Sequence, residues 1–564
     1  MKITSLASIS TTCLGLTLLA AAASAQTLPN IGDAVRQAQP PAKPVAPTPL
    51  PSIGGQTIEP PMSSLPSGPR LEVKSIAVVG NRVIATATLA ALIADGSGKT
   101  LSLAELEALA QRITKYYRAH GYFVARAYIP AQEIVDGAVK IRVVEGNYGE
   151  FHLKNQSLVR NSVVQGMLDN VKGADIVSVD TLERAMLIIN DTPGVQVTRA
   201  DVMPGEKVGT SDFAVDTVAK APYSGYVMLD NYGSTYTGKD RLSFDLDANS
   251  PTGSGDRLSL SGLATDHGDL LNGRLDYSAP LAANGLRGEV AVSQTTYRLA
   301  DTYAALDATG HAAGVDAILS YPIRRIEAQT ISTSLDIAYK NLVDDIGATD
   351  TRTPRYTLSA TAALALRDER SLFGVDGLTQ ASGTLTVGHL KFRDETAESL
   401  DEAGADTEGT YSKIVANLSR VSLLPHSLAL TTAFAGQYAV DHKTLDGTER
   451  MAVSGPNAVS AYPSDELIGD SALYLHVDLD DTLPAVSELR SDWLVFADYG
   501  EAWSSFSTAG VRSQRDIGDV GLAFNAHLHG FVLHANLSHR LAAAPPLSEP
   551  YSRNKLLLQG GWVF

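Results

Sequence analysis

The chain of 564 residues has a single cysteine, Cys13, and only 6% aromatic residues. Basic residues are in deficit, because 45 Lys and Arg stand against 62 Asp and Glu for a net charge of −17. This balance argues against a nucleic-acid partner, which needs a basic surface. After residue 26 no apolar run approaches the ~20 residues that a transmembrane helix requires. The composition therefore excludes a disulfide-stapled domain and a membrane protein built from helices.

Residues 1–25 have the pattern of a secretory signal peptide. Lys2 supplies the positive start, "CLGLTLLAAA" the apolar centre and Ala23–Ala25 the small-residue cleavage site. A short membrane anchor is the alternative, but the apolar centre is too short for one. Cys13 leaves with the signal peptide, so we expect an exported protein without thiol chemistry.

Residues 26–70 are rich in proline and predict an extended, semi-rigid linker. Ahead of most prolines, residues 28–38 read "LPNIGDAVRQA". Periodicity alone leaves two alternatives for this stretch, a short helix or a disordered tail.

Residues 71–148 and 149–221 are predicted to be two copies of one small α/β module. In the first copy "LEVKSIAVVGN" predicts a strand and 103–119 a helix, which Ser102 and Glu105 begin as a capping box. "YFVARAYIP" and "AVKIRVVEG" predict two further strands. The second copy repeats strand, helices and closing strands. This repetition indicates a tandem array.

Residues 222–564 read as short strands separated by turns, without helices. "RLSFDLDAN" alternates apolar and polar residues, as in a soluble sandwich or a membrane barrel. Three features favour the barrel: the length of the pattern, the alternation of short turns with long loops, and the end "LLLQGGWVF", in which Phe564 is terminal. At roughly 20 residues for each strand with its share of loop, the length predicts about 16 antiparallel strands.

Signal peptide, Pro-rich linker, two modules and a barrel together resemble a two-partner secretion transporter of the haemolysin secretion/activation family. The motifs that carry this resemblance are "VEGNY" closing the first module, "DNYGSTYTG" at 230–238, "SGPNAVSAYPSDE" at 454–466 and "FADYGEAW" at 496–503. The resemblance covers the whole mature chain. It implies two periplasmic POTRA-like modules and an outer-membrane barrel in a Gram-negative bacterium.

The resemblance implies that 440–469 is the sixth extracellular loop and folds back into the lumen. In the family the loop tip reads Val-Arg-Gly-Tyr, and its arginine pairs with an aspartate on the thirteenth strand. Here the aspartate is Asp498, but the tip has Ser460 in place of arginine. We therefore expect Asp498 either to be solvated or to meet another cation such as Arg450. The lumen-loop motif is Gly455, Pro456, Asn457, Val459, Ser460 and Tyr462.

The resemblance further implies export of one large secreted exoprotein, without ATP or a cofactor. The first module would capture the partner's amino-terminal secretion domain by adding a strand at an exposed sheet edge. We place this edge at 122–129, with a counterpart near 195–202 and the helix 103–119 as the wall of the groove. Segment 28–38 resembles the family's removable barrel plug. The predicted partner-binding residues are Tyr122, Phe123, Val124, Arg126, Tyr128, Leu106 and Tyr117.

Outer-membrane lipid and the barrel assembly machinery are further expected partners, the latter through Phe564 as the carboxy-terminal signal. His527, His529 and His534 could bind a metal or simply line a polar lumen, and we expect no metal. No enzyme signature is found. Two alternatives remain: an assembly factor of the same superfamily that inserts other proteins, and a passive porin.

Overall fold

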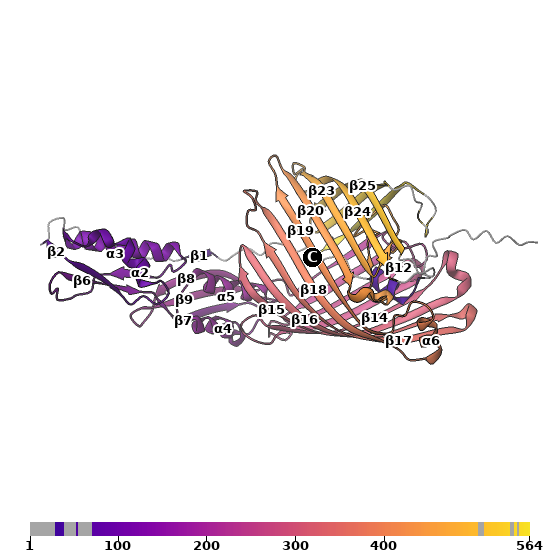
Figure 1. The fold of residues 1–564 in the computed structure, drawn as a ribbon, viewed down its shortest axis with the longest axis horizontal. Coiled ribbons are helices and arrows are strands. Elements are labelled where there is room, and N and C mark those ends of the chain that lie inside the picture. Colours follow the sequence, from indigo (N-terminus) through magenta and orange to yellow (C-terminus); the bar gives the residue numbers. More distant parts are fainter. Residues whose placement is uncertain are drawn as a thin grey trace, which may run out of the picture.

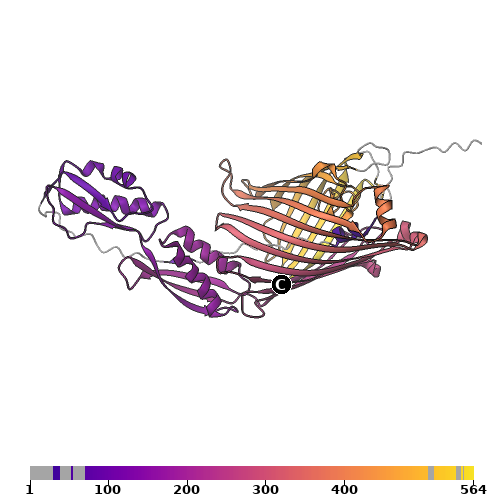
Figure 2. The same ribbon diagram turned by 60° about the horizontal axis from the view of Figure 1, so that its bottom comes forward.

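The computed structural model describes residues 29–38, 52–54, 70–505, 513–541, 546, 548–549 and 552–564. Two small α/β modules follow one another away from one end of a large β-barrel (Figures 1 and 2). This confirms the predicted fold class. The predicted signal peptide and most of the Pro-rich linker lie outside the described residues.

The first module has a three-stranded sheet in the order β3–β6–β5 and a separate β2–β4 pair. Helix α3 packs on the sheet with one apolar face, and Ser102 and Glu105 form the predicted capping box. The predicted strand 122–129 is shorter than expected, because only β5 is paired. The elements are β2 (Leu71–Val73), β3 (Ser75–Val79), α2 (Thr86–Leu92), η1 (Ala94–Gly96), β4 (Lys99–Leu101), α3 (Leu103–Ala119), β5 (Arg126–Tyr128) and β6 (Ala138–Val144).

The second module has a four-stranded sheet in the order β1–β8–β9–β7, in which β1 (Ser52–Gly54) comes from the linker. Its core is buried between the sheet and two helices, and Phe151 stacks on Phe213 with ring centroids 5.1 Å apart. The elements are β7 (Asn147–Gln156), α4 (Asn161–Asp169), η2 (Asn170–Ala174), α5 (Val179–Asp191), β8 (Gln196–Pro204) and β9 (Thr210–Val218).

The barrel has 16 antiparallel strands and is closed by pairing of its first strand with its last. The number is the one predicted. The strands are β10 (Tyr223–Asp230), β11 (Arg241–Asn249), β12 (Arg257–Thr265), β13 (Leu270–Pro280), β14 (Arg287–Arg298), β15 (Ala308–Ile326), β16 (Gln329–Ile346), β17 (Thr351–Asp368), β18 (Gly377–Phe392), β19 (Gly409–Leu423), β20 (Leu428–Ala439), β23 (Ser471–Thr482), β24 (Arg490–Ser504), β25 (Ser513–Leu528), β26 (Phe531–Arg540) and β27 (Asn554–Val563).

Side chains alternate between the outer wall and the lumen, as the period-two pattern predicts. On β11, Leu242 and Leu246 are on the exposed outer wall, whereas Ser243 and Asp245 are buried in the lumen. The last strand follows the same rule, with Leu556 and Trp562 outside. The outer wall is therefore an apolar band and the lumen is polar.

Turns at the end that carries the modules are short, and the longest loops, such as 393–408 and 440–470, are at the opposite end. The opposite end holds α6 (Glu395–Glu402), the short hairpin β21 (Met451–Ala452) and β22 (Ile468–Gly469), and the 3-10 turns η3 (Asp266–Gly268), η4 (Asp301–Leu306), η5 (Gly347–Thr349), η6 (Val440–His442) and η7 (Gly447–Glu449). Counted from β10, residues 440–470 form the sixth loop at this end, as predicted.

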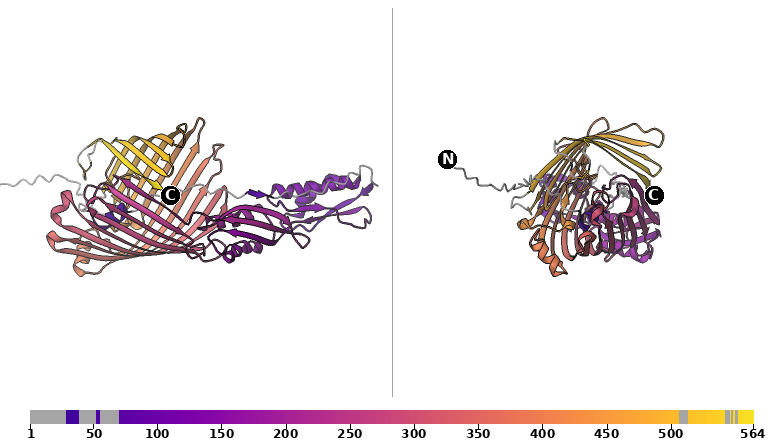
Figure 3. Two further views of the ribbon diagram at one scale, coloured as in Figure 1. Left: turned by 180° about the vertical axis from the view of Figure 1, so that it is seen from behind. Right: turned by 90° about the vertical axis from the view of Figure 1, so that its right-hand side faces the viewer.

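One helix lies inside the barrel. Helix α1 (Ile31–Gln37), drawn in indigo, lies among the barrel strands in the front and back views (Figures 1 and 3). Its apolar residues pack on lumen residues of several strands, among them Leu263, Tyr297 and Leu342. Among the described residues, no helix is long and apolar enough to span a membrane.

Candidate functional site

The sixth loop folds back into the lumen. Its stem is the β21–β22 hairpin, and its tip residues Val459 and Tyr462 are fully buried with Ile517 of the barrel wall. Gly455 makes the tight turn possible, because its φ is 103° and a Cβ there would lie 3.0 Å from the backbone of Ser464. Pro456 and the exposed Asn457 project into the open part of the lumen. The predicted hairpin in the lumen is therefore present.

The loop tip contacts β25 and β26, and not Asp498. The Ser460 hydroxyl donates to Asp519 Oδ2 at 3.2 Å, and the Ala461 N–H donates to the same oxygen at 2.6 Å. Arg540 Nε donates to the Ala461 carbonyl at 2.6 Å, and its guanidinium lies 4.8 Å from the centre of the Tyr462 ring. The Asp519 carboxylate and the Arg540 guanidinium of the barrel wall thus both hold the backbone of the tip.

Asp498 is only 6% exposed, so the expectation that it is solvated is wrong. It accepts hydrogen bonds from Tyr474 Oη at 2.7 Å and pairs with His476 Nδ1 at 2.6 Å. Arg450, the expected substitute cation, instead pairs with Asp470 at 3.0 Å. The basic side chain that meets Asp498 is therefore His476 and not Arg450. The register across neighbouring strands, which brings His476 beside Asp498, cannot be read from one segment.

Ion pairs hold the stem of the loop against the opposite wall. Asp446 accepts from Arg355 Nε at 2.7 Å, and Glu449 pairs with Lys340 at 2.9 Å and Lys413 at 3.0 Å. All these carboxylates are buried. The loop is therefore fixed at its tip and at its stem by different walls of the barrel.

The helix α1 contacts both the barrel and the sixth loop. The Asn30 side chain caps the helix by accepting a hydrogen bond from a backbone N–H of the first turn. The Ile31 N–H donates to Asp344 of β16 at 2.8 Å. Arg36 Nε pairs with Asp465 of the loop at 3.1 Å, and Gln37 Nε2 donates to the same carboxylate at 2.9 Å. This position in the lumen agrees with the helical alternative for segment 28–38.

The predicted partner-binding residues of the first module separate into three groups. Leu106 and Tyr117 are 4% and 0% exposed and belong to the module core, so the structure corrects their assignment to the groove wall. Phe123 and Val124 pack on the core of the second module, and Tyr122 packs on the first. They precede β5 in a turn, at which the two modules meet.

Only Arg126 and Tyr128 of the predicted set are on the edge strand β5. Among the described residues, β5 pairs with β6 on one side alone. Arg126 is exposed and Tyr128 half-buried. The N–H of Ala127 between them donates to Thr114 Oγ1 of α3 at 2.9 Å, so this edge donor already has an acceptor.

The predicted counterpart edge in the second module is covered. Strand β1 pairs in parallel with β8, with Ser52 opposite Arg199 and Gly54 opposite Asp201. The linker therefore occupies the position at which an added strand would bind. No local pattern indicates this pairing, because it joins segments nearly 150 residues apart.

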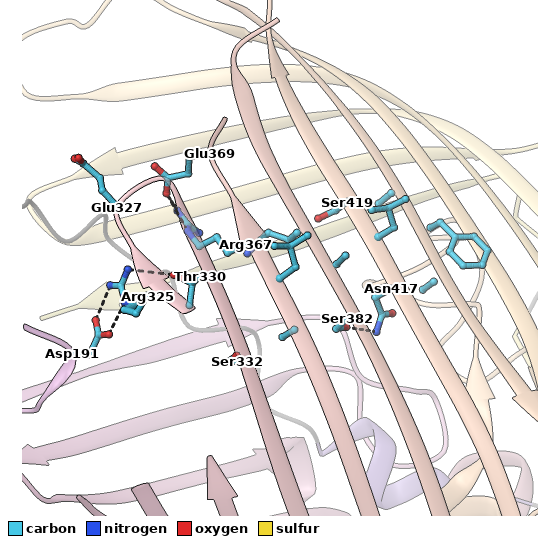
Figure 4. A pocket seen from close by; sticks show the side chains of 18 of the residues that line it. Asp191, Arg325, Glu327, Thr330, Ser332, Arg367, Glu369, Ser382, Asn417 and Ser419 are labelled. Atoms are coloured by element: carbon cyan, nitrogen blue, oxygen red, sulfur yellow. Dashed lines mark hydrogen bonds and ion pairs between the residues drawn. The ribbon is translucent and has the colours of Figure 1, made fainter. Parts of the chain in front are cut away.

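A cavity of about 930 Å³ opens where the second module meets the barrel (Figure 4). Charged residues stand at its rim, where Arg325 of β15 pairs with Asp191 of α5 at 2.7 Å. Deeper in, Asn417 Nδ2 donates to Ser382 Oγ at 3.2 Å (Figure 4). The deeper wall is formed by small uncharged residues of β16–β20, among them Ser332, Ala365, Ser382, Asn417, Ser419 and Ala435.

Two remaining predictions concern the end of the barrel. His534 pairs with Asn525 and His529 with Glu488, and within the described part of the chain no group of three His, Cys, Asp or Glu could hold a metal ion. Phe564 joins the first strand through two backbone hydrogen bonds with Gly225, and its ring packs on Trp562. It therefore completes the closure of the barrel.

Two protein-family models match the chain. The model of the haemolysin secretion/activation proteins ShlB/FhaC/HecB matches residues 209–522, and that of the ShlB-type POTRA domain matches residues 71–146. The chain belongs to the haemolysin secretion/activation family. It is an outer-membrane two-partner secretion transporter, a protein that exports a partner exoprotein, with its POTRA modules in the periplasm.

Relatives of the transporter support this. It is 31% identical over 423 residues to the heme/hemopexin transporter protein HuxB of Haemophilus influenzae strain 86-028NP, covering 74% of each chain. It is 22% identical to the outer membrane transporter CdiB of Dickeya dadantii over 73% of each chain. The solved structure of CdiB from Escherichia coli has the same fold, with a TM-score of 0.72, 19% identity and coverage of 91% and 94% of the two chains. The match to a secretion family favours export over the assembly-factor and porin alternatives.

Proposed function

We propose that the transporter exports a large exoprotein that binds haem or hemopexin. The observation that carries this proposal is the 31% identity to HuxB over 74% of both chains. A haemolysin, an adhesin or a contact-dependent toxin is the competing kind of cargo.

The first module captures the amino-terminal secretion domain of this exoprotein at strand β5. An incoming strand would add to the free side of β5, with the exposed Arg126 and the half-buried Tyr128 as the side chains that it meets. Its carbonyls need an N–H on that side, and Ala127 can supply one only if Thr114 gives up its hydrogen bond. Capture therefore competes with a contact inside the module.

The exoprotein then crosses the lumen along strands β16–β20. Beyond the charged rim, the wall of the cavity carries hydroxyl, amide and methyl side chains such as Ser382, Asn417 and Ala435, which offer an unfolded chain weak contacts. Helix α1 blocks the far end of this path and has to leave before export. The tip of the sixth loop is held on β25 and β26, whereas its stem pairs with β16, β17 and β19 and its Asn457 lines the cavity.

The outer wall and the end of the chain serve the two remaining partners. Outward leucines such as Leu335 and Leu558, each 43% exposed, meet the hydrocarbon of the outer membrane. The terminal Phe564 is the residue that we expect the barrel assembly machinery to recognise.

The path can be tested by crosslinking, because Cys13 is the only cysteine and lies in the predicted signal peptide. A cysteine replaces Ser382 in the lumen or, as a matched control, Leu385 on the outer face of the same strand, which is 49% exposed. An exoprotein stalled in transit should crosslink to position 382 and not to position 385. Equal crosslinking at both positions would contradict a path along this wall.

The cargo is tested by co-expression with candidate exoproteins encoded beside the transporter gene. The medium and the periplasm are assayed for the exoprotein, and the medium for haem or hemopexin binding. Deleting residues 71–148 should stop secretion and leave the barrel in the membrane. Secretion of a cargo that binds neither haem nor hemopexin would overturn the cargo proposal, and normal secretion after the deletion would overturn capture by the first module.

A further inference from the structure

The lumen face of four neighbouring strands carries a row of charged residues at one level. The strand register puts His476 opposite Asp498, Asp498 opposite Asp519, and Asp519 opposite Arg540. We call these four residues the charged row. The two carboxylates are in the middle and a basic side chain stands at each end, on β23 and β26.

We propose that Arg540 of the barrel wall takes the place of the loop-tip arginine that Ser460 replaces, and so positions the sixth loop for export. The inference rests on the export path proposed above. In this chain the cation is on the barrel wall instead of on the loop, and it binds the backbone of the loop.

The backbone of Ala461 is held from both sides. Its N–H donates to Asp519 and its carbonyl accepts from Arg540, each over 2.6 Å. The guanidinium also covers the Tyr462 ring, 4.8 Å from its centre. Arg540 and Asp519 are 5% and 0% exposed, so water competes little for these contacts.

The small, uncharged Ser460 is compatible with a cation at position 540. Ser460 is 2% exposed and its hydroxyl also accepts from Asn536 Nδ2 at 3.3 Å. An arginine at position 460 would enter a buried space beside the Arg540 guanidinium, with two cations close to the same carboxylate. Arg540 and an arginine at position 460 are therefore alternatives to each other, and each should be able to replace the other.

Holding the tip on β25 and β26 leaves the deeper wall around Ser382 and Asn417 open to the exoprotein, while Asn457 reaches the cavity. The stem of the loop pairs with Lys340, Arg355 and Lys413 on the same wall. A charge-assisted hydrogen bond of this kind shifts an equilibrium by roughly 10- to 150-fold. Without Arg540 we expect the ratio of held to released loop to fall by that factor, so that the loop enters the path and export declines.

The test measures the loop directly and export separately. Ala458, which is 9% exposed beside the tip, is replaced by cysteine, and the rate of its reaction with a maleimide is measured on the full chain in outer membranes. Arg540→Ala should raise this rate at least tenfold, and Arg540→Lys should raise it less. Arg540→Gln, which keeps a donor for the Ala461 carbonyl, should fall between them and serves if Arg540→Ala does not insert.

The decisive variant is the exchange of the two positions. Ser460→Arg alone should speed labelling, whereas Ser460→Arg combined with Arg540→Ala should restore slow labelling and export. Fast labelling in this double variant, or slow labelling in Arg540→Ala, would overturn the proposal. If no exoprotein is exported even by the wild type, the proposed function fails, while the labelling rates still decide whether Arg540 holds the loop.

Discussion

The ion pair of Arg36 is predicted to decide whether helix α1 stays in the lumen. The helix has seven residues, too few to be stable alone in water, so its contacts with the barrel and the sixth loop keep it in place. The Arg36 side chain is 10% exposed, pairs with Asp33 and Asp465, and donates to the Gly447 carbonyl. Arg36→Ala leaves two buried carboxylates without their shared cation.

Removing one partner of a buried ion pair costs about 3–5 kcal/mol. Even the lower value, about 3 kcal/mol, changes the ratio of inserted to released helix by roughly 150-fold. A helix that is released for 0.1% of the time, an illustrative population of roughly the size found for minor states, would then be released for about a tenth of the time. The change is large enough to be seen as ion flow through single barrels.

The assay is the current through the purified full chain in a planar bilayer. Arg36→Ala should increase the open time by one to two orders of magnitude, and Arg36→Lys should increase it much less because the charge remains. Arg352→Ala is the matched control, since that arginine is 66% exposed and meets Asp345 only at 3.6 Å. An open time in Arg36→Ala equal to that of the control would refute the reasoning.

Three further predictions concern the periplasmic modules. Thr114→Val removes the acceptor of the Ala127 N–H. We expect the module to lose about 1–3 kcal/mol in stability and to bind the exoprotein's amino-terminal domain more tightly in a titration. An unchanged affinity would speak against capture at β5. Ile53→Pro should detach β1 from β8 and speed hydrogen exchange at 196–204; exchange at the wild-type rate would show that the linker does not protect this edge. The pKa of Glu105 is lowered because the backbone N–H and then the hydroxyl of Ser102 donate to its carboxylate. This contribution to stability is complete above the unfolded pKa of about 4.3 and is lost as the pH falls through the folded value, so Ser102→Ala should destabilise the first module at pH 7 more than at pH 3, measured by urea unfolding.

Local patterns were sufficient where the physical cause is local. The capping box at Ser102 and Glu105 and the outward leucines of the strands depend on spacings of three and two residues, and the structure confirms both. They were insufficient for Leu106 and Tyr117. An amphipathic helix has a buried face and an exposed face, and those two residues are on the face that packs on the sheet.

The contacts that hold the tip of the sixth loop could not be predicted from the sequence. Asp498 was identified from its motif, but the carboxylate that receives the loop tip is Asp519, one strand further on. Arg540 and His476 carried no local signal at all. Each is an ordinary polar residue of an alternating strand, and only the register brings them to one level.

By itself, the sequence determined the architecture of the protein: two α/β modules and a 16-stranded barrel with an apolar outer wall. Periodicity, chain length and the lack of cysteine and of long apolar runs are enough for this, because each records a local requirement of folding in lipid or water. The tertiary structure decided which charges meet in the lumen, that α1 is tied to the loop, and that the linker covers β8. These contacts join residues up to several hundred positions apart, and their formation depends on strand register and barrel closure, which no single segment encodes.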